Sequence, residues 1–101
     1  MKLLIADDHA PMRALLRSMF GGRGTVVIEA PCGDEAVRLY AEHQPDWVFM
    51  DLKMEPLGGL NATRTIRGRF PAARIIVVTN CAGMEMRAEA ARAGAALFCR
   101  R

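Results

Sequence analysis

Four polar side chains stand at the ends of short apolar runs in this 101-residue sequence. Asp7 and Asp8 follow the first run, Asp51 follows the third, and Thr79 ends the fourth. In an open parallel α/β sheet, ligands bind outside the carboxyl ends of the strands, so these side chains are expected at one edge. Three carboxylates gathered there would repel one another, and a hard divalent cation such as Mg²⁺ removes that conflict. The spacing therefore indicates a magnesium site formed by Asp7, Asp8 and Asp51.

Each of these residues also has an ordinary structural explanation. Asp7 or Asp8 could cap the helix that follows. Asp51 could simply begin a loop, and Thr79 suits a strand by itself. Their joint placement at the ends of three strands favours a functional site over separate structural roles for each residue.

The elements that must position these residues are predicted by apolar patterning. Strands are expected over 3–6, 25–30, 47–50, 75–79 and 96–99, most of them continuously apolar as in a sheet buried on both faces. Helices are expected over 11–20, from 33 until Pro45 stops the chain, over 60–69 and over 84–93. The first carries an amphipathic stripe of Met12, Leu15, Leu16, Met19 and Phe20.

This alternation predicts one α/β domain over residues 1–101. We expect a flavodoxin-like, doubly wound parallel sheet of five strands in the order 2-1-3-4-5, lacking a fifth helix after the last strand. Strands 1 and 3 are neighbours in that order, which brings Asp7, Asp8 and Asp51 to one cleft.

Composition narrows the class of protein. The chain is 51% hydrophobic and 25% charged, as in an ordinary globular domain with one core. Its first apolar run is too short for a signal peptide or a membrane span, so we expect a cytoplasmic protein without membrane contact.

The charged residues do not form a nucleic-acid-binding patch in the sequence. The 14 basic residues are scattered among 11 acidic ones, which favours solvated helix faces over direct nucleic-acid binding. The three cysteines lack metal-ligand spacing and predict reduced, mostly packed thiols.

Four segments together resemble the receiver (CheY-like) domain of two-component response regulators, from residue 2 to the last residue. They are Leu4-Ile5-Ala6-Asp7-Asp8-His9, Val48-Phe49-Met50-Asp51-Leu52-Lys53-Met54, Gly59-Leu60 and Ile76-Val77-Val78-Thr79. The resemblance implies that Asp51 accepts a phosphoryl group from a sensor histidine kinase or phosphotransfer protein, and that the domain then switches conformation to control a partner or output. It also implies no enzyme activity beyond self-phosphotransfer and autodephosphorylation.

The same resemblance implies roles for individual residues. Mg²⁺ would be held by Asp7, Asp8, Asp51 and the backbone carbonyl of Lys53. Thr79 would be the switch hydroxyl that bonds the phosphoryl group, and Phe98 the aromatic side chain that rotates with it.

Three positions depart from the family's pattern. Arg101 stands where the family has a lysine, and it is the candidate phosphate-binding cation although its planar fork differs from an ammonium group. Glu55 replaces a proline, and Asn80 replaces a small residue. These departures, together with the expected lack of a fifth helix, leave open a second function, a receiver-like interaction module that is not phosphorylated.

Two further alternatives concern the context of the domain. A flavodoxin-like enzyme or nucleotide binder is disfavoured, because neither a GxGxxG motif nor a P-loop follows the first strand. The Asp-Asp-His opening and residues 59–64 resemble receivers that precede a helix-turn-helix output domain, so the chain is either a stand-alone regulator or a piece of a longer one. Without a fifth helix, strand residues 75–78 and 96–99 would line a partly bare sheet face. We expect a homodimer through that face, where Cys99 could also crosslink.

Overall fold

The computed structural model describes residues 1–54, 57–79 and 84–100. Strands and helices alternate along the chain: β1 (Lys2–Ala6), α1 (Ala10–Phe20), β2 (Val26–Ala30), α2 (Gly33–His43), β3 (Trp47–Met50), α3 (Gly59–Arg69), β4 (Ile75–Thr79), α4 (Met84–Ala93) and β5 (Leu97–Arg100). The predicted strands and helices are therefore confirmed. None of the described helices combines the length and the apolar character that crossing a bilayer requires.

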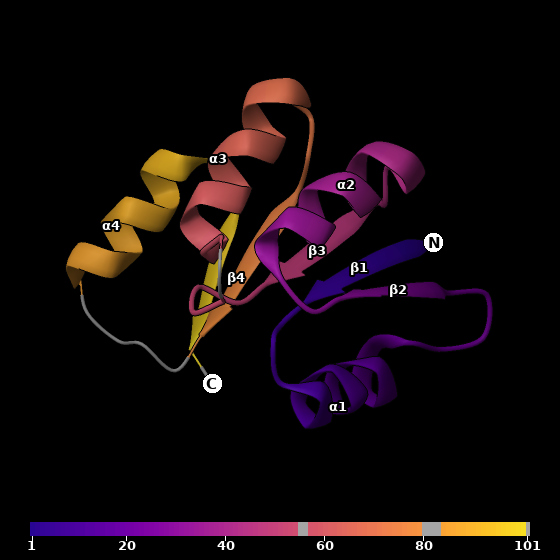
Figure 1. Ribbon diagram of the computed structural model, residues 1–101. Coiled ribbons are helices and arrows are strands. Elements are labelled where there is room, and N and C mark those ends of the chain that lie inside the picture. The colour runs from indigo at the N-terminus through magenta and orange to yellow at the C-terminus, as the bar shows by residue number, and fades with distance from the viewer. Residues whose placement is uncertain (55–56, 80–83, 101) are drawn as a thin grey trace.

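The strands form one five-stranded parallel sheet in the order β2-β1-β3-β4-β5, as predicted. Figure 1 shows α2, α3 and α4 on one face of this sheet and α1 on the other. This is the flavodoxin-like, doubly wound arrangement, in which the carboxyl ends of the strands share one edge.

The face under α2, α3 and α4 is the well-packed one. Side chains of β1, β3 and β4 such as Leu4, Val48 and Ile75 are completely buried there, together with Ile66 of α3. The continuously apolar strand sequences reflect burial of this kind. In a doubly wound sheet helices pack on both faces, so successive side chains of a strand are apolar whichever face they point to.

The face under α1 is only partly covered. Of the amphipathic stripe on α1, Leu16 is buried, whereas Leu15 and Met19 remain 50% and 62% exposed. On β4, Ile76 and Val78 point to this face and are half-buried. One helix about 10 Å across spans roughly two strands spaced about 4.8 Å apart, so α1 alone cannot cover the sheet.

Two arginines on α1 join that helix to the edge strand β2. Arg13 donates from Nε to Glu29 at 3.0 Å, and Arg17 donates to the other Glu29 oxygen at 2.9 and 2.7 Å. The Arg17 side chain is 49% exposed, as expected for a solvated helix face, but Arg13 is only 17% exposed. For Arg13 the expectation of a solvated charge is therefore wrong, because its guanidinium lies between the helix and β2.

The start of α3 depends on a glycine that lies against the backbone directly after β3. A Cβ atom on Gly59 would collide with the Asp51 carbonyl oxygen, and the Gly59 amide donates to the Leu52 carbonyl at 3.0 Å. Gly68, near the end of the same helix, has nothing within 4 Å of its Cβ position. Gly59 thus allows α3 to begin directly against the loop that carries Asp51.

The glycine pair provides a matched test of this close approach. We expect Gly59→Ala to lower the free energy of unfolding by about 1–3 kcal/mol, the usual cost of overpacking. Gly68→Ala should raise it by about 0.5–1 kcal/mol, because alanine restricts the unfolded chain and favours a helix. Urea denaturation measures both, and a Gly59→Ala protein as stable as wild type would contradict the close approach.

The Glu29 bridge predicts a pH dependence of stability. The hydrogen bond from Arg17 is the main cause that lowers the pKa of Glu29 below its ordinary value of 4.5, with Arg13 contributing further. A carboxyl group whose pKa is lowered by folding stabilises the protein above its unfolded pKa, and this contribution is lost as pH falls through the folded pKa.

We therefore compare wild type with Glu29→Gln by urea denaturation between neutral pH and pH 3. Wild type should be the more stable protein at neutral pH, and the difference should shrink below pH 4.5. Glu42→Gln, which removes a more exposed carboxylate on α2, is the matched control. A wild-type advantage over Glu29→Gln that stays constant across this range would show that the bridge does not depend on the carboxylate charge.

Candidate metal centre

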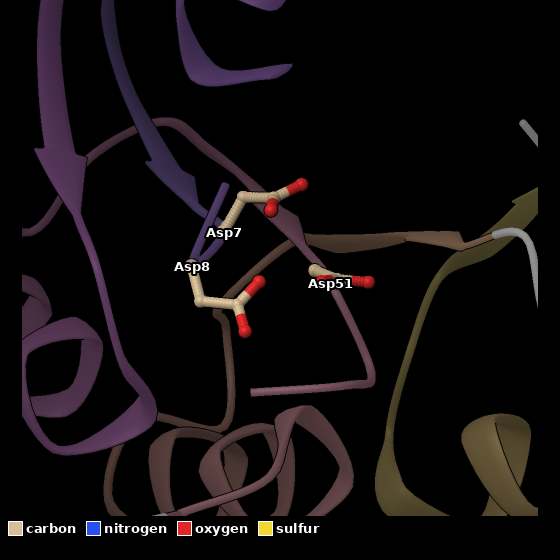
Figure 2. Close-up of side chains that lie close together, drawn as sticks. All are labelled: Asp7, Asp8 and Asp51. Atoms are coloured by element: carbon tan, nitrogen blue, oxygen red, sulfur yellow. The ribbon is translucent and has the colours of Figure 1, made fainter. Parts of the chain in front are cut away.

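Three carboxylates lie together at the carboxyl edge of the sheet. Asp7 and Asp8 follow β1 and Asp51 follows β3, and Figure 2 shows their side chains around one space. One oxygen from each carboxylate lies within 4.8 Å of the others. Asp7 and Asp51 are buried, at 1% and 6% exposure, whereas Asp8 faces solvent. The strand order thus brings together the three acids that the sequence singled out.

The sheet itself positions these acids through backbone hydrogen bonds. The Asp51 amide donates to the Ala6 carbonyl at 2.9 Å, and the Asp7 amide donates to the Ala30 carbonyl at 3.0 Å. The His9 amide in turn donates to Asp7 Oδ1 at 2.9 Å. Because the first two bonds continue the ladders of parallel strands, the buried acids are held by the sheet and not by a loose loop.

The donor set suits a hard divalent cation. It consists of carboxylate oxygens, partly buried and open to solvent on the Asp8 side. Mg²⁺ prefers such a site, with one or two carboxylates and its remaining positions filled by water or phosphate oxygens. In the part of the chain that the structure describes, no other group of three acidic, histidine or cysteine ligands comes together. Lys53, whose carbonyl is a further predicted ligand, is exposed and three residues from the end of β3.

The predicted switch residues lie on the neighbouring strands. Thr79 is the last residue of β4 and is completely buried. Phe98 of β5 pairs in register with Val77, and Val77 points to the same face of the sheet as Thr79, two residues further along β4. Thr79 and Phe98 therefore share the face that α2, α3 and α4 cover. The Phe98 ring is partly buried, and the Arg87 guanidinium lies 5.3 Å from its centre. Their roles remain predictions.

Several sequence predictions fall elsewhere. Arg101, Glu55 and Asn80 lie outside the described residues. Cys32 is half-buried and Cys99 is exposed, both as free thiols, in keeping with the expectation that Cys99 lies on the bare face of the sheet. Cys99 lies on β5, where none of the helices that the structure describes covers its side of the sheet.

One residue beside the acids carried no signal in the sequence. Arg13 Nη1 donates to the backbone carbonyl of Asp7 at 2.6 Å, in addition to its contact with Glu29. An arginine in the second turn of a helix looks like any solvated charge, and its acceptor here is a main-chain oxygen.

Comparison with known proteins agrees with this geometry. The family described as "Response regulator receiver domain" matches residues 3–100. The chain is 38% identical over 100 residues to the uncharacterized transcriptional regulatory protein YhcZ of Bacillus subtilis, covering 97% of this chain and 47% of YhcZ. It is also 38% identical over 98 residues to the chemotaxis protein CheY of Bacillus subtilis, covering 96% of this chain and 82% of CheY.

A solved structure shows the same fold. The CheX–CheY–BeF3–Mg²⁺ complex from Borrelia burgdorferi superimposes with a TM-score of 0.94 at 26% identity, covering 100% of this chain and 78% of that chain. The chain spans about half the length of YhcZ, so the activity of a whole protein of that length is a separate question. The family match and these relatives show that this chain belongs to the response regulator receiver domains.

Proposed function

We propose that residues 1–101 act as one receiver domain that takes a phosphoryl group on Asp51 from a sensor histidine kinase or phosphotransfer protein. The observation that supports this proposal is the gathering of Asp7, Asp8 and Asp51 within 4.8 Å at the carboxyl edge of the sheet. Such a domain works in the cytoplasm and needs neither a membrane nor direct contact with nucleic acid.

In the proposed reaction, a carboxylate oxygen of Asp51 is the nucleophile. It forms a bond to phosphorus as the bond between phosphorus and the donor histidine nitrogen breaks, and that nitrogen keeps the electron pair. The transfer needs positioning and charge neutralisation more than covalent help. A bound Mg²⁺ would supply much of that neutralisation. Asp7 and Asp8, with the Lys53 carbonyl, would hold the ion beside Asp51.

The switch would follow from the new charge. The acyl phosphate carries nearly two negative charges at pH 7, whereas the Asp51 carboxylate carried one. The Thr79 hydroxyl would donate a hydrogen bond to a phosphoryl oxygen, and the Phe98 side chain would rotate in response. Arg101 is the proposed cation that pairs with the phosphoryl group. Lys53, Asn80 and Arg101 are expected to alter turnover, because their side chains should border the phosphoryl group and there pair with its charge or control the access of water.

A second candidate function is an interaction module that is not phosphorylated. The sequence departures at Arg101 and Glu55 favour it, because a guanidinium does not replace a lysine ammonium in geometry or hydration. The two functions share the fold and differ in the chemistry of Asp51.

Intact mass spectrometry after treatment with acetyl phosphate and Mg²⁺ separates these functions. Wild type should gain one phosphate, Asp51→Asn should gain none, and a chelator should prevent the reaction. Asp34→Asn, which removes an exposed acid from the first turn of α2, is the matched control and should react like wild type. Phosphate that persists on Asp51→Asn would move the nucleophile elsewhere, and an unmodified wild type would favour the interaction module.

We also propose that the 101-residue chain forms a homodimer through the partly covered α1 face. An apolar groove of about 350 Å³ lies there between α1 and the sheet, lined by Leu15, Met19 and Phe20 on one side and by Val78 and Cys99 on the other. Exposed apolar surface of this kind marks interaction sites on soluble proteins. A second copy can bury the same patch symmetrically.

Light scattering at micromolar concentration tests the dimer. Wild type should have twice its 11.1 kDa mass, and the double variant Leu15→Glu, Met19→Glu should be monomeric. Val26→Glu, at an exposed apolar position of β2 outside the groove, should stay dimeric. A monomeric wild type that binds no hydrophobic dye would rule out this interface.

A further inference from the structure

Arg13 connects the acidic site to the neighbouring edge strand β2. Its Nη1 donates to the Asp7 carbonyl at 2.6 Å, while its Nε donates to Glu29 of β2 at 3.0 Å. Arg17 holds the second oxygen of Glu29. With 17% exposure, the Arg13 side chain has little freedom to leave this position. The guanidinium is thus fixed on one side by a carboxylate and bonds a main-chain oxygen on the other.

That main-chain oxygen belongs to the peptide bond between Asp7 and Asp8. The orientation of a peptide plane sets the directions of the side chains on both sides of it. The Asp7 amide is already bound to Ala30, and Asp7 Oδ1 accepts the His9 amide. The Arg13 bond to the carbonyl therefore fixes the plane from which both carboxylates extend.

We propose that Arg13 is a positioning residue for the metal centre, which orients Asp7 and Asp8 by holding the carbonyl between them. The inference rests on the proposed function, because it assigns Arg13 to the Mg²⁺ site described there. Partners that orient metal ligands typically change metal affinity by 10–100-fold when they are removed.

Electrostatics alone predicts the opposite effect. A guanidinium near the site repels a divalent cation, so removing its charge would tighten Mg²⁺ binding. Arg17 separates the two effects, because it carries the same charge on the same helix and also binds Glu29, but the backbone carbonyl to which it donates is that of Val27 and not that of Asp7. The direction of the change in Mg²⁺ affinity therefore distinguishes positioning from charge.

The experiment is Mg²⁺ titration by calorimetry on the 101-residue chain, with far-UV circular dichroism to confirm that each variant is folded. Arg13→Gln should weaken Mg²⁺ binding by about 10-fold, within the usual range for such orienting partners. Arg17→Gln should bind within about 2-fold of wild type or more tightly, as its charge change predicts. Arg13→Lys should lie between wild type and Arg13→Gln, because an ammonium group can still donate to the Asp7 carbonyl but lacks the fork that also reaches Glu29.

The rate of phosphorylation by acetyl phosphate adds a second readout. At saturating Mg²⁺ the rate for Arg13→Gln should return to near the wild-type value, because the loss lies in ion binding and not in the reactivity of Asp51. Wild-type affinity in a folded Arg13→Gln, or an equal loss in Arg17→Gln, would overturn the inference while leaving the proposed function intact. A wild type that neither binds Mg²⁺ nor takes phosphate would overturn the proposed function and this inference together.

Discussion

The crowding of Asp7, Asp8 and Asp51 is the constraint on which the functional end of this molecule depends. Like charges within 4.8 Å repel one another, and two of the three carboxylates are largely removed from water. Despite this repulsion, hydrogen bonds that continue the β1–β2 and β1–β3 ladders hold the two buried acids in place. The sheet therefore holds the three carboxylates close together, and a bound divalent cation would remove the repulsion between them.

Much of the fold could be predicted because burial leaves a clear pattern in the sequence. β3 and β4 are short apolar runs covered by α2, α3 and α4, and their continuous apolar character predicted a parallel sheet. Turn and helix-ending residues predicted where the helices stop. The placement of Asp7 and Asp51 at adjacent strand ends followed from the strand order alone.

Other features depend on contacts between distant segments, which no local pattern specifies. The stripe on α1 predicted an amphipathic helix but not which of its apolar residues are covered. Leu16 is buried, whereas Leu15 and Met19 are exposed because one helix cannot cover β1, β3 and β4 together. The role of Arg13 was invisible for a related reason. Its acceptors are a main-chain carbonyl and a carboxylate 16 residues along the chain, and neither leaves a spacing signal.

The most direct test is to measure the free energy of unfolding of wild type and Asp8→Asn, each in a chelator and in Mg²⁺. It shows whether the three carboxylates repel one another in the empty site and whether a bound cation removes that repulsion. In the chelator Asp8→Asn should be more stable by on the order of 1 kcal/mol, because one like charge is removed. Mg²⁺ at ten times its Kd should stabilise wild type by about 1.4 kcal/mol, through binding to the folded state alone. It should stabilise Asp8→Asn much less. A wild type that is already the more stable protein in the chelator and gains nothing from Mg²⁺ would contradict this account.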